Sequence, residues 1–150
     1  MPPAATLSQL RAKIPPGFRR TCQQLDPTES ALRRSLLVAA QCTPSSADLG
    51  GPVPAYSFYF SYADLDAATT AYRAYYAPGD LPAGDCTSGP ADLVYERDGL
   101  SGTLRCYTDG EGFQVFAWTA DDLAVVASVA DRNLSYADLY RWWQHAGPLR

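Results

Sequence analysis

The sequence predicts a single α+β domain, in which one antiparallel sheet of about six strands carries helices packed on one face. Between residues 92 and 130, four short apolar runs alternate with turn-forming residues, as in an antiparallel meander. Apolar residues also recur at helical spacing near both ends and near the middle of the chain. A length of 150 residues is most simply one domain, with residues 1–6 as a disordered tail and residues 7–150 as the folded unit.

The beginning of the chain predicts one helix and one strand. Leu7, Leu10 and Ile14 lie at helical spacing, which favours a short helix over residues 7–14 that ends before two prolines. The run DPTESALRR indicates a turn or a short helix. The apolar run SLLVAAQC, residues 35–42, has the length of a buried strand, and a buried helix is its alternative.

An aromatic strand and a helix are expected next. Apart from Tyr59, aromatic and small residues alternate in AYSFYFSY, residues 55–62, which is typical of a strand with one aromatic face. A helix follows directly from Ser61, with Leu65, Thr69, Tyr72 and Tyr76 on one stripe. Gly, Pro and Ser then indicate a loop over residues 77–90.

The rest of the chain predicts four strands and a final helix. The runs DLVYER, TLRCYT, FQVFAWT and LAVVASVA are separated by turn signals. For residues 123–130 a helix is the alternative, because Thr119 and Asp122 resemble a capping box, but the valines favour a strand. The last helix runs from Ser135 to about His145, where a Gly-Pro pair ends it.

The pentapeptide Ser-Tyr-Ala-Asp-Leu occurs twice, at residues 61–65 and 135–139. Serine followed three residues later by aspartate is a variant of the capping box, in which the serine hydroxyl accepts a hydrogen bond from a backbone N–H of the first turn. We therefore expect Ser61 and Ser135 to cap two helices, with the two leucines as their first core contacts. Different segments precede the two copies, which argues against a duplicated binding motif.

The charge of the chain excludes some partners. A net charge of −4 gives no basis for nucleic-acid binding, which requires a basic face. Basic residues are in excess in residues 1–34, which indicates packing across the acidic remainder or a patch facing a membrane or partner. No apolar stretch approaches the roughly 20 residues of a membrane span, and no secretory signal is visible. We therefore expect either a cytosolic protein or a piece excised from a longer one.

The four cysteines form two pairs of equal sequence separation, Cys22 with Cys42 and Cys86 with Cys106. No pair has the Cys-x-x-Cys spacing of zinc or thioredoxin-like sites. Of the three connectivities, these two pairings are favoured because each closes a short loop onto a strand, which stabilises by roughly 3 kcal/mol in the chain-entropy model. Disulfides imply an oxidising compartment, whereas four buried thiols in a cytosolic protein are the alternative.

Residues with catalytic chemistry are few. His145 is the only histidine, and an imidazolium in the last turn of a helix is already favoured by the helix dipole. Asp121 and Asp122 are the only adjacent carboxylates, and aspartate suits the turn predicted there. No calcium-loop, phosphate-loop or nucleophile-elbow motif is present. We therefore expect no catalytic residue, no cofactor and no metal site.

Aromatic side chains are the richest chemical feature of the sequence. Trp142 falls beside the apolar stripe of the last helix, and Tyr75 falls beside that of the earlier helix. Exposed Trp and Tyr are favoured at interfaces, so Trp142, Tyr75 and Trp118 are the candidate contacts for a ligand or a protein partner. Shielding of a sheet edge or a neighbouring loop is the alternative for such residues.

Seven segments, in order along most of the chain, carry a resemblance to a known family. They are LRAKIPPGFRRTC (10–22), VAAQC (38–42), YSFYFSYADLDAATTAYRAYY (56–76), GDC (84–86), GTLRCY (102–107), FAWTADDLAVVASV (116–129) and LYRWW (139–143). With them the chain resembles the extracellular sensor-like domain of actinobacterial transmembrane serine/threonine protein kinases and related exported proteins. LYRWW and the four cysteines are the most specific part of this resemblance.

The resemblance implies a domain that senses a ligand or partner outside the cell, while a kinase domain lies in the cytosol. The chain has no kinase Gly-rich loop, H-R-D or D-F-G signature, so it corresponds to the sensor-like part, excised from a membrane-tethered parent. The resemblance also favours the disulfides and a strand at 123–130. It offers no catalytic or ligand residue to carry over.

We therefore expect a non-catalytic, extracellular binding or sensing domain with an unknown ligand or protein partner. The first alternative is a small cytoplasmic protein with free thiols that works by protein–protein association. The second is an enzyme of unknown chemistry, which would need a pocket that joins His145 to carboxylates or to a hydroxyl.

Overall fold

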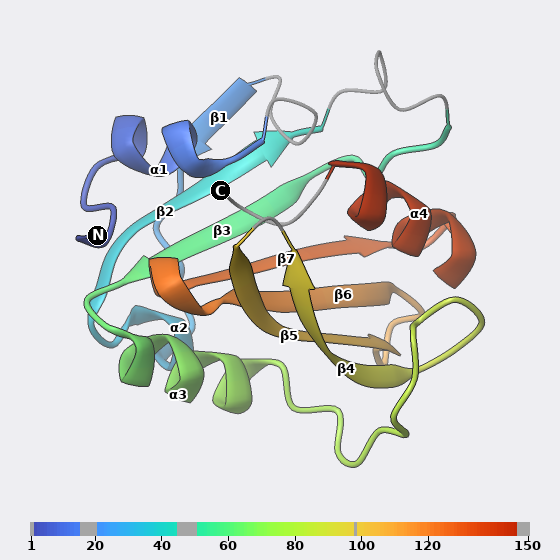
Figure 1. The fold of residues 1–150 in the computed structure, drawn as a ribbon. Helices are drawn as coiled ribbons and strands as arrows, with labels where there is room; N and C mark the ends of the chain where they lie inside the picture. Colours follow the sequence, from blue (N-terminus) through green and yellow to red (C-terminus); the bar gives the residue numbers. More distant parts are fainter. Residues whose placement is uncertain (1, 16–20, 45–50, 98, 147–150) are drawn as a thin grey trace.

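The computed structural model describes residues 2–15, 21–44, 51–97 and 99–146. Within these ranges, seven strands form one antiparallel sheet in the order β1-β2-β3-β7-β6-β5-β4, accompanied by four α-helices and a short 3-10 helix (Figure 1). The predicted α+β class and antiparallel sheet are therefore confirmed. No helix in the described ranges is long and apolar enough to cross a membrane.

The elements occur in an order close to the predicted one. The two runs with a helical alternative, residues 35–42 and 123–130, form strands over Leu36–Thr43 and Val125–Asp131, and Leu123 belongs to a short 3-10 helix before the second strand. Along the chain the elements are α1 (Leu7–Lys13), β1 (Thr21–Gln24), α2 (Ser30–Arg33), β2 (Leu36–Thr43), β3 (Ser57–Tyr62), α3 (Leu65–Tyr75), β4 (Ala91–Arg97), β5 (Leu100–Thr108), β6 (Gln114–Ala120), η2 (Asp121–Leu123), β7 (Val125–Asp131) and α4 (Tyr136–Ala146).

The additional strand, β1, lies at one edge of the sheet. It has four residues, TCQQ, and pairs with β2 in a register that sets Cys22 opposite Cys42. Three of its four residues are exposed, so it shows neither an apolar run nor alternation. The sequence pattern therefore gave no signal for this strand.

Helices cover both faces of the sheet, whereas the sequence predicted helices on one face. Leu10 of α1 and Trp142 of α4 belong to one core, and Leu32 of α2 and Tyr72 of α3 belong to the other. Figure 1 shows α1 and α4 above the strands and α2 and α3 below them. The physical reason lies in β6 and β7, which are buried along most of their length and therefore need apolar cover on both sides.

Residues 2–6 lie against the domain, where the sequence predicted a disordered tail. Ala4 is buried, and its carbonyl accepts a hydrogen bond of 2.6 Å from Ser61 Oγ. Thr6 caps α1, because its hydroxyl accepts from the Gln9 backbone N–H at 3.2 Å. The partner of this segment is distant in sequence, so local patterns do not reveal it.

The two copies of Ser-Tyr-Ala-Asp-Leu begin their helices at different residues. Ser135 caps α4 as predicted, since its hydroxyl accepts from the Asp138 backbone N–H at 3.1 Å. Ser61 does not cap α3, because it lies inside β3. Asp64 is the cap instead, and its carboxylate accepts from the Ala67 backbone N–H at 2.8 Å. The strand must leave the sheet before the helix can begin.

This later start changes the buried face of α3. Leu65 is 43% exposed, whereas Ala68, Ala71 and Tyr72 are buried. Leu139 of α4 is fully buried, as predicted. The Gly-Pro pair expected to end α4 lies outside the described residues.

Candidate functional site

Two of the three predicted aromatic contacts are core residues. Trp118 and Trp142 are 0% and 2% exposed, and their ring centroids lie 6.4 Å apart in an edge-to-face arrangement. Trp118 also meets Tyr59 and Trp143 at 6.4 and 6.3 Å. These indoles fill the space between α4 and the sheet, so neither is an exposed anchor. Tyr75 is 42% exposed, as a contact residue requires.

Both predicted disulfides are present. Cys22–Cys42 joins β1 to β2, and Cys86–Cys106 joins the loop after α3 to β5. Cys42, Cys86 and Cys106 are buried. Two buried cross-links of this kind are compatible with an oxidising, extracellular setting.

The residues considered for catalysis have local structural roles. The exposed His145 has Nδ1 2.9 Å from the Arg141 carbonyl oxygen, one turn earlier in α4. Asp121 and Asp122 begin the 3-10 turn between β6 and β7, where the Thr119 hydroxyl donates to the Asp121 carboxylate at 2.9 Å. In the described ranges, no group of three or more His, Cys, Asp or Glu residues is arranged to hold a metal.

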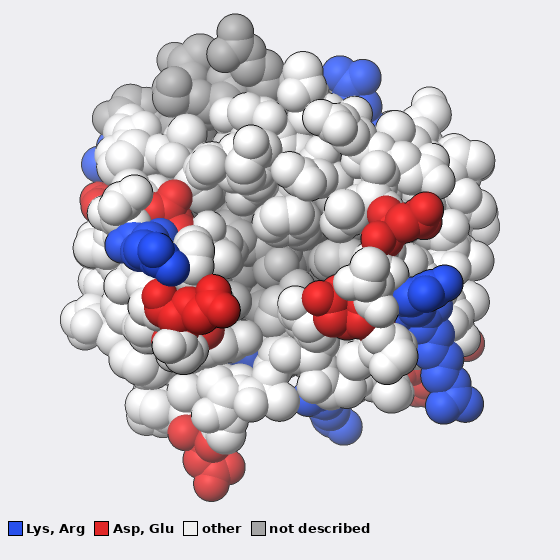
Figure 2. Space-filling model, turned by 180° about the vertical axis from the view of Figure 1, so that it is seen from behind, with Lys and Arg blue, Asp and Glu red and all other residues white. Residues whose placement is uncertain are grey.

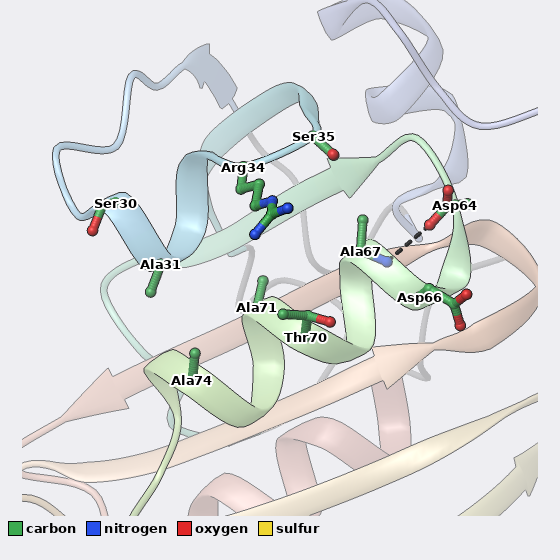
Figure 3. A pocket seen from close by; sticks show the side chains of 10 residues that line it. All are labelled: Ser30, Ala31, Arg34, Ser35, Asp64, Asp66, Ala67, Thr70, Ala71 and Ala74. Atoms are coloured by element: carbon green, nitrogen blue, oxygen red, sulfur yellow. Dashed lines mark hydrogen bonds between the residues drawn. The ribbon is translucent and has the colours of Figure 1, made fainter.

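A groove of about 550 Å³ separates α2 from α3. Figure 3 shows alanines of both helices facing one another across it, with Arg34 pointing in from the end of α2. Asp64 at its other end caps α3 and is engaged there. Methyl groups and a few dispersed charges give this groove little chemistry with which to select a ligand.

A second hollow of about 650 Å³ lies between α3 and strands β4 and β5. Two of its charged groups pair with each other: Arg105 Nε is 3.3 Å from the Asp92 carboxylate. The Arg105 guanidinium also lies 4.8 Å from the centre of the Tyr72 ring. Arg105 also donates to the Tyr76 carbonyl. This arrangement holds α3 to the sheet. The Arg105 guanidinium is therefore already bound by other groups of the protein.

A third hollow of about 340 Å³ is lined by aromatic side chains, and we call it the tyrosine hollow. It lies on the sheet face that carries α2 and α3, beside the ends of these helices. Its lining consists of residues 25–29, Leu32, Phe58, Phe60, Tyr75, Tyr76, Tyr107, Val115 and residues 128–130. Its size is at the lower end of the range for small-molecule pockets.

The chain positions the aromatic walls through ordinary secondary structure. Phe58 and Phe60 alternate on β3, so both point to the face of the hollow. Tyr75 ends α3 and Tyr76 follows it, with ring centroids 4.9 Å apart in an edge-to-face contact. Tyr107 completes the aromatic lining from the end of β5.

The phenols of the hollow stay neutral well above physiological pH. Burial raises the pKa of Tyr76, whose hydroxyl makes a hydrogen bond of 2.7 Å with Ser128 Oγ. Burial also raises the pKa of Tyr107, to about 12. For Tyr75, burial and then the nearby Glu29 carboxylate raise the pKa. The hollow therefore offers apolar rings with neutral hydroxyls.

Acidic residues border the tyrosine hollow. Asp26 and Glu29 line it from the segment between β1 and α2, and both are exposed. Figure 2 shows the side turned away in Figure 1, with a hollow of uncharged side chains near its centre and acidic side chains on both sides of it, where basic side chains also lie. Among the described residues, no basic side chain forms an ion pair with Asp26 or Glu29.

Of this site, the sequence predicted Tyr75 and missed the rest. The sequence predicts Tyr76 on the core stripe of its helix, which agrees with its burial. The stripe does not indicate that Tyr76 also lines the floor of the hollow. Tyr107 follows the buried Cys106 in β5, so its side chain lies on the opposite face of the sheet. The alternation in this strand could have predicted that position. Asp26 and Glu29 lie in a turn whose position depends on β1, which the pattern did not predict.

Comparisons with known proteins do not assign the chain to a family. The sequence matches no family model, and neither curated proteins nor solved structures gave a match.

Proposed function

We propose that this chain is a non-catalytic, extracytoplasmic binding domain and that the tyrosine hollow is its binding site. The observation that carries the proposal is the hollow itself: an open, aromatic-lined depression on a sheet face that α2 and α3 leave partly uncovered. Pockets for small ligands are mostly apolar and have a few convergent polar groups. The rings and hydroxyls of Tyr75 and Tyr107 fit that description.

The proposed location outside the cytosol is supported by Cys22–Cys42 and Cys86–Cys106, because disulfides persist in oxidising compartments. The resemblance to the sensor-like domains of actinobacterial transmembrane kinases supports a role as the external, ligand-binding part of a membrane protein. The domain binds a ligand outside the cell, and a parent protein tethered to the membrane transmits the event.

The lining of the hollow supports a binding role instead of a catalytic one. Its hydroxyls belong to neutral phenols, to Ser128, which is hydrogen-bonded to Tyr76, and to Thr28, which donates to the Glu29 carboxylate at 3.4 Å. No imidazole base lies beside these hydroxyls, because His145, the single histidine of the sequence, lies on α4, over the opposite core. We therefore propose an apolar or aromatic ligand that binds by ring packing.

Ligand-observed saturation-transfer NMR with benzyl alcohol tests this function. We expect saturation transfer from the native protein and its loss in Ala130→Trp, because Ala130 is exposed on β7 and lines the hollow. Ala74→Trp is the matched control, since it adds the same ring to the groove between α2 and α3. The proposal fails if the native protein gives no transfer, or if only Ala74→Trp abolishes it.

A further inference from the structure

We infer that the tyrosine hollow selects ligands that join an apolar group to a cation, as an arylalkylammonium does. This inference rests on the proposed function and names the class of ligand for the same site. It follows from three features of the hollow: its carboxylates, its exposed aromatic ring, and a lining that contains no basic side chain among the described residues.

The first feature is the pair of carboxylates at the border. Asp26 and Glu29 come from one short segment between β1 and α2, and both are exposed while lining the hollow. Glu29 is close enough to Tyr75 for its charge to affect the phenol. A ligand whose apolar part fills the hollow would therefore place an attached charge beside this pair.

The second feature is the aromatic ring beside the same carboxylates. Tyr75 is 42% exposed, so its ring is available from solvent. Cations are attracted to the face of an aromatic ring within about 6 Å of its centre, and this attraction adds to that of nearby carboxylates. Anions gain nothing from either group.

The third feature concerns the basic side chains. Among the described residues, none that lines the hollow is basic. Arg105 is held by Asp92 and by the Tyr76 carbonyl. Arg132 lies 4.4 Å from the centre of the Phe113 ring and donates to the Glu111 carbonyl. Arg33 shares a neighbouring hollow with Asp26 but does not line the tyrosine hollow. Among the described residues, the charged groups of the lining are therefore the carboxylates of Asp26 and Glu29, which disfavour an anionic ligand.

Three probes that share a phenylethyl body test the inference by NMR titration: 2-phenylethylamine, 2-phenylethanol and 3-phenylpropionate. We expect affinity to fall in that order, with the amine binding about tenfold more tightly than the carboxylate at low salt, and the difference to shrink at high salt. Equal affinities for the three probes would overturn the inference and leave the proposed function standing. Binding of none of them would overturn the proposed function itself.

A matched pair of double variants locates the effect. Asp26→Asn with Glu29→Gln should reduce the affinity for the amine about fivefold and leave that for the alcohol unchanged. Asp66→Asn with Asp80→Asn changes the net charge equally at exposed sites that do not line the hollow, and should alter neither. An equal loss in both double variants would show that overall charge, not the two border carboxylates, sets the preference.

Discussion

The Tyr76 hydroxyl lies 2.7 Å from Ser128 Oγ, and both residues are buried beneath the tyrosine hollow. Tyr76 directly follows α3, and Ser128 lies in the middle of β7. The bond therefore fixes the end of the helix to the sheet at the floor of the hollow. It also holds the neighbouring Tyr75 ring at the edge.

This bond should be measurable as a coupling between the two side chains. Tyr76→Phe and Ser128→Ala should each destabilise the domain by about 1–2 kcal/mol, because each leaves the other hydroxyl buried without its partner. The double variant should cost less than the sum, with a coupling energy of about 1 kcal/mol. Urea unfolding of the four proteins measures it, and strict additivity would show that the bond does not form.

Replacing the serine by alanine should have different effects in the two copies of the pentapeptide. Asp64→Ala and Ser135→Ala should each cost about 1 kcal/mol, because each removes a helix cap. Hydrogen exchange should then show fraying at the start of α3 and α4 respectively. Ser61→Ala should leave the start of α3 protected, since its hydroxyl bonds the Ala4 carbonyl instead. Fraying of α3 in Ser61→Ala would contradict the assignment of Asp64 as the cap.

The two disulfides should differ in their effect on binding. Both close loops with a sequence separation of 20, so removing either pair by alanine substitution should cost about 3 kcal/mol. Cys22–Cys42 anchors β1, and β1 leads directly into residues 25–29, which line the hollow. The start of this segment is also held to β2, because the Leu25 backbone N–H donates to the Ala39 carbonyl at 2.9 Å. Removing that pair should therefore weaken probe binding as well.

Removal of the second pair supplies the control for this prediction. Both disulfides belong to the core on the opposite face of the sheet, but Cys86–Cys106 does not join the strand that leads into residues 25–29. Its loss should lower the unfolding free energy and leave the affinity for 2-phenylethylamine unchanged at temperatures where the domain is folded. Equal losses of affinity in both variants would refute a specific role of Cys22–Cys42 at the hollow.

Stability should fall in alkaline solution because of the tyrosines. Burial raises the pKa of Tyr72 and of Tyr107 to about 12, above the value of about 10 in an unfolded chain. The folded state then holds protons that the unfolded state releases, so stability is full below about pH 10 and declines toward pH 12. Unfolding free energies measured across this range should show the decline, with a smaller slope in Tyr107→Phe. A pH-independent value would contradict the burial of these phenols.

Much of the fold could be predicted because its elements carry local signals. The alternation in β3 and the turns between β4, β5, β6 and β7 are visible in the sequence. Whether helices cover one or both faces of the sheet could not be predicted in the same way. An apolar run indicates that a strand is buried but not which elements bury it. β1 was missed because a polar edge strand is held by its neighbour and its disulfide.

The site was less predictable than the fold, for two physical reasons. The sequence pattern does not decide whether the side chains of Trp118 and Trp142 are exposed or buried. The packing of α4 on the sheet buries both. Asp26 and Glu29 line the same hollow as Tyr75 although their segments are far apart in sequence. Tyr75 was predictable because it departs from the stripe of its own helix.

The most direct test of the central claim is a two-dimensional ¹H–¹⁵N NMR titration of the native protein with 2-phenylethylamine. We predict that the largest shift changes occur at Glu29, Tyr75, Tyr107 and Ser128, which come from four different elements around one hollow. Changes centred on Ala67 and Ala71, in the groove between α2 and α3, would contradict the account. So would changes dispersed over the surface without saturation.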